Sequence, residues 1–404
     1  MRIYQFTELG YHPAWEGEDD TLRISIPNSR FDPELGAKIL NDCFDFWMAC
    51  DELGFDIMVN EHHSTATCLS ISPSMSLSIL ARQTRNARLL ALGSAIANRP
   101  DPVRVAEEMA WIDVLSRGRL DCGLVRGAPT EVVPTMSNPV RQIDRFWEAH
   151  DLIVKCFESH DGPFNWEGEY YNYRQVNIWP RPYQQSRPPI WITGTTRANA
   201  DRIAKEKHVG VAFFGAPKAK QFVDWIYESA ASYGWTPDPY KFGYLGIVAV
   251  GETDEEGRRR GQQILEYLRT ATIVAEEWRN PPGYQPIETN VGMLSKPPAS
   301  GAFFSGFMMK TRSGKMVSFK DATADDLADA GIVFSGSPDT VYRQITEFDD
   351  YVGGIGNLCV MMHGGNLPQD EALKNVELFA REVHPRLKEH TAAKLQSGRR
   401  FEAA

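Results

Sequence analysis

The chain has 404 residues, of which 42% are hydrophobic and 24% are charged, so it can bury a large core without disulfide or metal staples. Its net charge of −10 disfavours a nucleic-acid partner, because proteins that bind polyanions usually present a basic face. No apolar run approaches the roughly 20 residues that span a bilayer, which argues against a membrane partner. The 6 cysteines are scattered, as is typical of free thiols in a reducing compartment, and we therefore expect a cytoplasmic protein.

From the N-terminus onward, short apolar segments of β type alternate with amphipathic helical stretches, which is the pattern of parallel strands covered by helices. We predict an α/β fold in which eight strands close a (β/α)8 TIM barrel, with insertions after strand 1 and after strand 7. An open dinucleotide-binding sheet is the alternative, but no G-x-G-x-x-G fingerprint follows the first strand. The candidate strands cover residues 2–9, 55–60, 89–96, 120–125, 190–193, 210–214, 242–250 and 358–362.

Proline and glycine mark the boundaries of the predicted helices. Pro33 opens the first helix, and Gly54 follows its end in the position that favours glycine. Pro102 and Pro338 open two more, and a further stretch carries apolar residues at helical spacing. The four helices cover residues 35–53, 103–115, 140–157 and 339–351.

Two segments are too long to be plain connections: residues 11–31 after the first strand and residues 270–331 after the seventh. Long irregular segments in a compact barrel are usually functional lids or disordered excursions. The second segment carries Phe304 and Phe307, whose side chains need an apolar surface. We interpret it as an active-site lid, with subunit packing or disorder as the alternatives. The predicted single domain covers residues 1–390 and the C-terminal tail covers residues 391–404.

The second predicted strand runs into Asn60, Glu61, His62 and His63, at the carboxyl end of a barrel strand, where the active sites of this fold lie. A histidine there can accept or donate a proton near neutral pH, and an adjacent carboxylate can fix its tautomer. A hydrogen-bonded structural cluster is the alternative. The position at the strand end favours Glu61, His62 and His63 as catalytic residues.

The same cluster could bind a metal, since histidine and glutamate are common ligands of zinc and iron. A catalytic zinc normally needs three placed ligands, however, and neither H-x-H nor H-x-x-x-H spacing accompanies these residues. We therefore predict no metal site. Cys68 could be a nucleophile, but no local signature supports this, and a packed thiol is the simpler interpretation.

An arginine and a hydroxyl-rich segment lie at the ends of the fourth and fifth predicted strands. Arg126 is followed by Gly127, and a guanidinium fork fits a phosphate while glycine lets the backbone approach closely. Residues 193–196, Thr-Gly-Thr-Thr, offer hydroxyls and unpaired N–H groups at a helix N-terminus. An ion-pair arginine and an ordinary helix cap are the alternatives for each element alone. On adjacent strands, the two together predict an anion site.

Successive motifs of the chain resemble those of the bacterial luciferase-like flavin-dependent monooxygenases, in the order and at the spacing of that family. The resemblance covers most of the chain outside the two insertions and the residues after about 389. The motifs are Glu61-His62-His63, Gly93-Ser94-Ala95, Pro102-Val103-Arg104 with Ala106-Glu107, the stretch from Ser116 to Gly127, residues 193–196, and the stretch from Gly336 to Val341.

The resemblance implies that reduced FMN binds at the mouth of the barrel, with its phosphate held by Arg126, Gly194 and Thr195. Members of the family often have a non-proline cis peptide bond under the flavin, which would fall near Ala95 and Ile96 in this chain. Such bonds are rare and costly, so they mark functional sites.

The resemblance also implies the chemistry. In this family O₂ adds to the reduced flavin to give a C4a-peroxide, and a closed apolar site suppresses its wasteful decay. His62 would be the proton-transfer residue, with Glu61 and His63 in support. A separate NAD(P)H:flavin reductase would supply reduced FMN, because the chain shows no nicotinamide-binding fingerprint. The family further suggests a homodimer.

The substrate is expected to be a small or medium organic molecule. The segment after Arg126 lacks the aromatic residue of the light-emitting members, which argues against aldehyde oxidation. An F420-dependent dehydrogenase on the same barrel is the nearest alternative, and a metal-dependent barrel hydrolase or a non-catalytic flavin-binding subunit would be functions of another class. The predicted substrate-binding residues are Asn60, Cys68, Phe214, Phe304 and Phe307.

Overall fold

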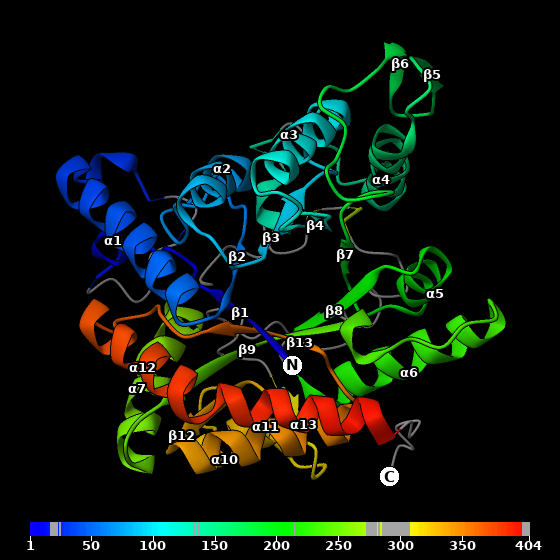
Figure 1. Ribbon diagram of the computed structural model, residues 1–404. Coiled ribbons are helices and arrows are strands. Elements are labelled where there is room, and N and C mark those ends of the chain that lie inside the picture. The colour runs from blue at the N-terminus through cyan, green and yellow to red at the C-terminus, as the bar shows by residue number, and fades with distance from the viewer. Residues whose placement is uncertain are drawn as a thin grey trace.

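The structure of the chain is a computed structural model that describes residues 1–16, 23, 26–132, 134–135, 137–213, 215–271, 281, 283–284 and 308–397. Helices surround a central barrel of strands, with the N-terminus at the end of β1 and helices α11, α12 and α13 packed along one side (Figure 1). Across the described ranges, none of the helices combines the length and the apolar character needed to cross a membrane.

Eight parallel strands close the barrel. β1 lies between β2 and β13, and the pairing of β8 with β9 completes the ring. This confirms the predicted α/β TIM barrel, and the strands differ from the predicted segments only at their ends. They are β1 (Arg2–Phe6), β2 (Asp56–Val59), β3 (Leu89–Ala95), β4 (Leu120–Val125), β7 (Ile190–Thr193), β8 (Val209–Phe213), β9 (Phe242–Val250) and β13 (Asn357–Met361).

Several helices begin directly after a side chain that caps them. Asp32 precedes Pro33 and accepts a hydrogen bond from the Glu34 N–H at 2.9 Å, and Asp101 caps the helix that starts at Pro102 in the same way. Each such cap stabilises its helix by about 1 kcal/mol. The long helices are α1 (Pro33–Glu52), α2 (Pro73–Gln83), α3 (Pro102–Leu115), α4 (Gln142–Glu158), α5 (Arg197–Glu206), α6 (Ala216–Ser232), α7 (Asp254–Thr270), α11 (Pro338–Val352), α12 (Gln369–Glu382) and α13 (His384–Ser397).

A ninth parallel strand, β12 (Val333–Gly336), was not predicted. It pairs with the second half of β9, from Ile247 to Val250, and all of its residues are buried. Four residues, Val-Phe-Ser-Gly, directly after a long insertion carry too little periodicity to indicate a strand. The seventh β/α unit of the barrel therefore contains two strands.

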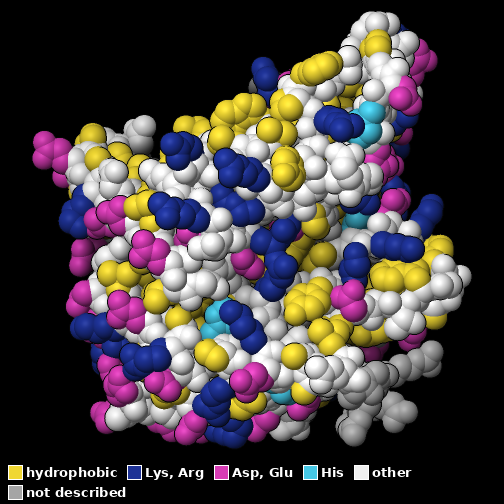
Figure 2. Space-filling model, viewed as in Figure 1, with side chains coloured by type: hydrophobic (Ala, Val, Ile, Leu, Met, Phe, Trp, Pro, Cys, Tyr) yellow, Lys and Arg dark blue, Asp and Glu magenta, His cyan; other side chains and the backbone are white. Residues whose placement is uncertain are grey.

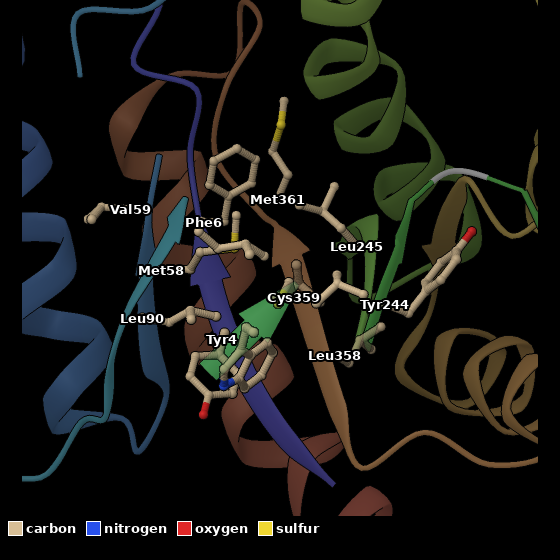
Figure 3. Packing of buried hydrophobic residues seen from close by; sticks show 14 of the residues in the cluster. Tyr4, Phe6, Met58, Val59, Leu90, Tyr244, Leu245, Leu358, Cys359 and Met361 are labelled. Carbon is tan, nitrogen blue, oxygen red and sulfur yellow. The ribbon is translucent and has the colours of Figure 1, made fainter. Parts of the chain in front are cut away.

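Aromatic side chains fill the barrel interior on the side away from the carboxyl ends of the strands. Tyr4 packs edge-to-face against Trp191, with ring centroids 5.2 Å apart, and its hydroxyl donates to Asp121 at 2.8 Å. Such an aromatic pair contributes about 0.5–1.5 kcal/mol beyond its buried area. Closer to the carboxyl ends of the strands, the interior is lined by apolar side chains (Figure 3). These include Phe6, Met58, Leu245 and Met361.

The two predicted insertions contain short elements. The described residues of the first include η1 (His12–Ala14) and η3 (Asn28–Arg30). Those of the second include the hairpin β10 (Met308–Lys310) and β11 (Met316–Ser318), followed by α10 (Ala324–Asp329). A hairpin that was not predicted, β5 (Phe164–Glu167) with β6 (Asn172–Val176), extends outward beyond α4 (Figure 1).

The predicted boundary between the domain and a tail at residue 391 lies inside a helix. Helix α13 runs to Ser397, Thr391 is buried in it, and the Lys394 ammonium binds the Asp349 carboxylate of α11. A buried position and an ion pair to the barrel's outer layer are features of a packed element. The packed part of the chain therefore extends at least to Ser397.

Candidate functional site

A cavity of about 420 Å³ opens at the carboxyl ends of the barrel strands. Its floor is apolar, its rim is polar, and the first turns of α4 form an aromatic side wall. Active sites of (β/α)8 barrels lie at this end, and the cavity draws residues from several strands and loops at once. The floor includes Phe6, Met58, Leu92, Val125 and Leu245; the rim includes Glu8, Asn60, Glu61, His62, Arg126, Gly194, Thr196 and Asn199; the side wall includes Ile143, Phe146 and Trp147.

His62 lies in the cavity and is fixed from behind by Glu131. The Nδ1 atom of His62 is 2.9 Å from Glu131 Oε1, and Nε2 is 3.7 Å from Glu8 Oε2. The Glu131 carboxylate is buried in the turn η4 (Pro129–Glu131), where it also accepts hydrogen bonds from the N–H groups of His63 and Ala128, at 2.8 and 3.1 Å. These three donors hold the carboxylate still. The His62 ring therefore has one orientation, with Nδ1 turned away from the cavity.

Glu61 and His63 form a second, separate cluster. His63 Nε2 is 2.9 Å from Glu61 Oε1, and Arg99 binds Glu61 Oε2 at 3.0 Å. The backbone N–H of Ala95 donates to the same carboxylate at 3.3 Å. These contacts hold Glu61, which is buried at the edge of the cavity, and its pKa is lowered because the His63 and Arg99 hydrogen bonds outweigh the effect of burial.

The charges around His62 favour its protonated form. Burial opposes a charge on the ring, but the hydrogen bond to Glu131 and the nearby carboxylates of Glu8 and Glu61 outweigh it and raise the pKa of His62 to about 9. The hydrogen bond that His63 donates to Glu61 likewise raises the pKa of His63. At neutral pH His62 is thus an imidazolium, which can act as an acid.

Glu8, which sequence reasoning missed, is the other carboxyl group of the rim. It follows β1 and accepts a hydrogen bond from the Asn60 amide at 2.7 Å. Burial raises the pKa of Glu8, against the opposing effects of His62, Asn60 and Tyr267. Glu8 therefore holds a proton more readily than an exposed glutamate does.

Arg126 presents its guanidinium to the rim next to Tyr284. The Cζ atom of Arg126 lies 3.8 Å from the centre of the Tyr284 ring, and Nη1 donates to the Tyr284 carbonyl oxygen at 3.0 Å. The Tyr284 hydroxyl donates to the carbonyl oxygen of Gly127 at 2.8 Å. Stacking on an aromatic face leaves the other donors of a guanidinium available and fixes its plane.

The start of α5 offers a second group of anion donors. These donors are backbone N–H groups, whereas Arg126 uses its side chain. Thr196 caps the helix by accepting from the Asn199 N–H at 3.2 Å, and Gly194 has a φ of +111° that favours glycine. A Cβ at Gly194 would lie 2.5 Å from Asn199 Nδ2. Within the described residues, the N–H groups of Gly194, Thr195 and Arg197 make no backbone hydrogen bond, so they remain available to an anion at the helix N-terminus.

The cavity therefore fits a phosphate-bearing cofactor with a flat apolar ring. Cationic and N–H donors converge on its rim, while its floor and side wall are apolar and aromatic. FMN has this distribution of chemistry. The residues present could hold the phosphate with Arg126 and the start of α5, and the ring against the apolar floor.

The predicted site residues divide into three groups. The cavity brings together Asn60, Glu61, His62, Arg126 and Gly194. The residues that lie outside its lining are His63, Cys68, Ala95, Ile96 and Thr195. Phe214, Phe304 and Phe307 lie outside the described residues, so their predicted contact with substrate stays a prediction.

One detail differs from the expectations for individual residues, the position of the cis peptide bond, and one agrees with them, the packed thiol of Cys68. The non-proline cis peptide bond of β3 joins Leu92 and Gly93, which line the cavity, and does not lie near the fully buried Ala95 and Ile96. Burial raises the pKa of Cys68 well above its usual value, and its thiol lies 3.6 Å from Asn60 Oδ1. Such a neutral, packed thiol is a poor nucleophile.

The described residues contain one cluster that could hold a metal ion, and it is remote from this cavity. Asp349, Asp350 and His390 lie where α11 meets α13, but the Lys394 ammonium binds both carboxylates. An ammonium already supplies the positive charge that a metal would bring. His62 of the cavity and the neighbouring His63 instead each face a carboxylate through a hydrogen bond.

Comparison with known proteins agrees with this geometry. A sequence model of the family described as luciferase-like monooxygenase matches residues 25–353. The chain is 23% identical to limonene 1,2-monooxygenase of Rhodococcus erythropolis over 83% of this chain and 78% of that protein. It is 27% identical to the oxygenase component of the flavin-dependent trigonelline monooxygenase of Acinetobacter baylyi, over 40% of this chain and 45% of that protein. The chain spans 60% and 45% of the length of two of the curated relatives that it matches.

A solved structure has the same fold. The oxygenating constituent of 3,6-diketocamphane monooxygenase from Pseudomonas putida, described as a type II Baeyer–Villiger monooxygenase in complex with FMN, aligns with a TM-score of 0.67. The alignment covers 96% of this chain and 99% of that chain at 21% sequence identity. At this identity the likeness bears on the fold alone.

Proposed function

The chain belongs to the luciferase-like monooxygenase family, and from this membership we propose that it binds reduced FMN at the carboxyl end of the barrel and inserts one oxygen atom of O₂ into an organic substrate. The observation that carries the proposal is the pairing, in one cavity, of an anion-binding rim with an imidazolium at His62. When bound, reduced FMN would supply the electrons that activate O₂.

The residues of the chain have distinct roles in this proposal. Arg126 and the N–H groups at the start of α5 bind the phosphate and fix the position of the ring. The apolar floor excludes water from the reacting atoms. His62 donates a proton from Nε2 into the cavity, while Glu131 holds its Nδ1 proton and stabilises the charged ring.

The source of reduced flavin is the next part of the proposal. We infer that a separate NAD(P)H:flavin reductase delivers reduced FMN, and the relative named as an oxygenase component of a flavin-dependent monooxygenase supports a two-component arrangement. The substrate is a small or medium organic molecule that packs against the aromatic side wall of α4.

An exposed apolar surface supports a homodimer. It consists of side chains on α2 and just before it, on α3 and on the segment that follows β6, and Figure 2 shows hydrophobic side chains gathered along the edge where α2 and α3 lie. Trp111 is 50% exposed and Met75 is 64% exposed, and exposed apolar side chains that gather in one patch mark an interaction surface. We propose that this surface binds a second copy of the chain. Its members are Ile71, Met75, Ile79, Trp111, Val114 and Trp179.

The experiment that tests the function supplies the purified chain with reduced FMN, generated by a generic NAD(P)H:flavin reductase, and a panel of cyclic terpenes, ketones and N-heterocycles under ¹⁸O₂. We expect one substrate class to gain a single ¹⁸O atom in a reaction that stops when FMN is omitted. Oxidation of an alcohol with F420 as the acceptor, and no ¹⁸O gain from any compound, would favour the dehydrogenase instead.

A further inference from the structure

Tyr284 is a buried residue of the second insertion that contacts the residues after β4 at three points. Its ring centre lies 3.8 Å from Arg126 Cζ, and its carbonyl oxygen accepts a hydrogen bond from Arg126 Nη1 at 3.0 Å. Its hydroxyl donates to the carbonyl oxygen of Gly127 at 2.8 Å. All three residues line the cavity at the carboxyl ends of the strands, which we call the cofactor cavity, so these contacts belong to that site.

The Arg126 guanidinium has no acidic partner. The guanidinium of Arg99, by comparison, forms an ion pair with the Glu61 carboxylate, which neutralises its charge. The described residues give Arg126 only the ring and the carbonyl oxygen of Tyr284, and no carboxylate among them forms an ion pair with it. Its positive charge and its remaining N–H donors are therefore available to an anion in the cofactor cavity.

We propose that Tyr284 is a positioning residue that holds the Arg126 guanidinium in the orientation that binds the phosphate of FMN. This inference rests on the proposed function, in which Arg126 contacts that phosphate. A long side chain loses rotamer freedom when it binds an anion, and this loss weakens binding. Because Tyr284 already restricts the Arg126 side chain, less freedom is lost when the phosphate binds, and the affinity is higher.

These contacts use both the ring and the hydroxyl of a tyrosine. The face of an aromatic ring attracts a guanidinium, whereas an aliphatic side chain of similar size does not. The hydroxyl binds the carbonyl oxygen of Gly127, which is itself closely packed. The φ of Gly127 is +97°, and a Cβ there would lie 2.4 Å from Asn98 Nδ2. The hydrogen bond to this fixed carbonyl group therefore keeps the ring in place beside Arg126.

The turn that carries Tyr284 packs against Val140, just before α4. The Tyr284 N–H donates to the Pro281 carbonyl oxygen at 3.0 Å, which closes the turn, and Gly283 lies in it with a φ of +86°. A Cβ at Gly283 would lie 2.6 Å from Val140 Cγ2 and 3.1 Å from Val140 Cα. A side chain at this position would therefore push the turn, and Tyr284 with it, away from Arg126.

The test compares the affinities for reduced FMN and reduced riboflavin, which differ only in the phosphate, under anaerobic conditions. Tyr284→Leu removes the ring, and Tyr284→Phe removes only the hydroxyl. Tyr342→Leu is the matched control, because Arg386 Cζ lies 4.0 Å from the centre of the Tyr342 ring. This second stack of a tyrosine and an arginine involves α11 and lies outside the lining of the cofactor cavity.

We expect Tyr284→Leu to raise the Kd for reduced FMN by about tenfold and to leave that for reduced riboflavin within about twofold of the wild type. Tyr284→Phe should stay within about threefold for both flavins, because the stack remains. Tyr342→Leu should bind both flavins as the wild type does. An equal loss of affinity for both flavins in Tyr284→Leu would show that Tyr284 binds the flavin itself and would overturn the proposal.

A double substitution shows whether Tyr284 acts through Arg126. In an Arg126→Ala background, Tyr284→Leu should have no further effect on the Kd for reduced FMN, because the ring then has no guanidinium to position. If Tyr284→Leu has its full effect without Arg126, the two residues act independently and the proposal is wrong.

A substitution outside the contact itself tests the role of the turn. Gly283→Ala should weaken the binding of reduced FMN, and not of reduced riboflavin, in the same way as Tyr284→Leu. Gly314→Ala is its control, because Gly314 has the same φ of +86° but an added Cβ would meet no other group within 4 Å. Wild-type affinity for reduced FMN in Gly283→Ala would overturn the role of the turn in placing Tyr284.

A further readout needs no cofactor. The ring current of a tyrosine shifts the NMR signals of a guanidinium over its face upfield. In ¹⁵N-arginine-labelled apoprotein, the Nε–H signal that disappears in Arg126→Lys should lie upfield in the wild type and in Tyr284→Phe, and should return to the usual range in Tyr284→Leu. An unshifted Arg126 signal in the wild type would overturn the positioning. A shifted signal in a wild type that does not bind reduced FMN would instead overturn the proposed function, while the contact between Tyr284 and Arg126 would stand.

Discussion

The Nδ1 atom of His62 lies 2.9 Å from the Oε1 atom of Glu131, although 69 residues separate the two in the chain. A buried carboxylate at this distance stabilises the imidazolium over the neutral ring. His62 is therefore charged at neutral pH, with a pKa raised to about 9, against the effect of burial, by Glu131 and the neighbouring carboxylates. In the proposed function this charge makes His62 the proton donor of the cavity.

Replacement of His62 tests this role. His62→Ala should lower the rate of oxygenation by about 10²–10⁴-fold, because that is the usual contribution of a positioned acid or base. The affinity for reduced FMN should stay within a few-fold of the wild type, since the phosphate is held elsewhere. His160→Ala, which changes an exposed histidine, is the control and should behave as the wild type. Wild-type turnover in His62→Ala would remove His62 from the mechanism.

Replacement of Glu131 should move the pH dependence of the reaction. If the imidazolium form of His62 is required, wild-type activity is lost as the pH rises through about 9. Glu131→Gln removes a hydrogen bond that raises the pKa of His62, so the loss should begin at a lower pH. The measurement is kcat against pH for the wild type, Glu131→Gln and the exposed control Glu167→Gln. A descending limb at the same pH in all three would contradict this account of the His62 charge.

Replacement of Arg126 should weaken the binding of FMN without changing the fold. A charge-assisted hydrogen bond contributes about 1.5–3 kcal/mol, so Arg126→Ala should raise the Kd for FMN by about 10- to 100-fold. Arg343→Ala, which removes an exposed arginine of α11, should leave the Kd unchanged. The affinity for riboflavin, which has no phosphate, should hardly respond to Arg126→Ala. An equal loss of affinity for both flavins would show that Arg126 does not bind the phosphate.

A single charged side chain introduced into the proposed dimer surface should separate the dimer. Trp111→Glu should convert a dimer of twice 45.5 kDa into a monomer, because a carboxylate in the centre of an apolar interface is desolvated without a partner. Sedimentation or light scattering gives the mass, and Leu395→Glu on α13 is the control at a distant exposed leucine. A dimer that survives Trp111→Glu would place the interface on another face.

Much of the fold and part of the site follow from local sequence. The barrel strands are apolar runs between amphipathic helices, and prolines such as Pro33 and Pro102 begin helices in both the prediction and the structure. The carboxyl ends of parallel strands meet at one face of a barrel. The positions of His62, Arg126 and Gly194 at strand ends were therefore enough to predict that they share one cavity.

The residues that were missed are placed by tertiary contacts. Glu131 reaches His62 only because Ala128 and Pro129 lead the chain into the turn η4, and nothing in the sequence indicates the direction of that turn. Glu8 lies two residues past the end of β1, although the predicted strand included it. Its side chain faces the cavity because of the path that the chain takes after the strand, and the sequence does not indicate that path. Trp147 has helical spacing like any core residue of α4, so its position in the cavity wall carries no sequence signal.

Tertiary contacts also determine how the neighbouring residues Glu61, His62 and His63 are arranged. Three consecutive residues looked like one catalytic group, yet Glu61, at the edge of the cavity, is held by His63 and Arg99, while His62 is held by Glu131. Side chains of successive residues in an extended segment point to opposite sides. The partners on each side, 38 and 69 residues further along the chain, determine which of them meets the ligand.

The most direct test of the central claim is the anaerobic binding of reduced FMN to the wild-type protein, compared with reduced riboflavin and reduced F420 by fluorescence or calorimetry. The account predicts saturable binding of reduced FMN at one site per chain, with reduced riboflavin bound about 10- to 100-fold more weakly for want of the phosphate contacts. Tight binding of reduced F420 with no measurable affinity for reduced FMN would contradict it.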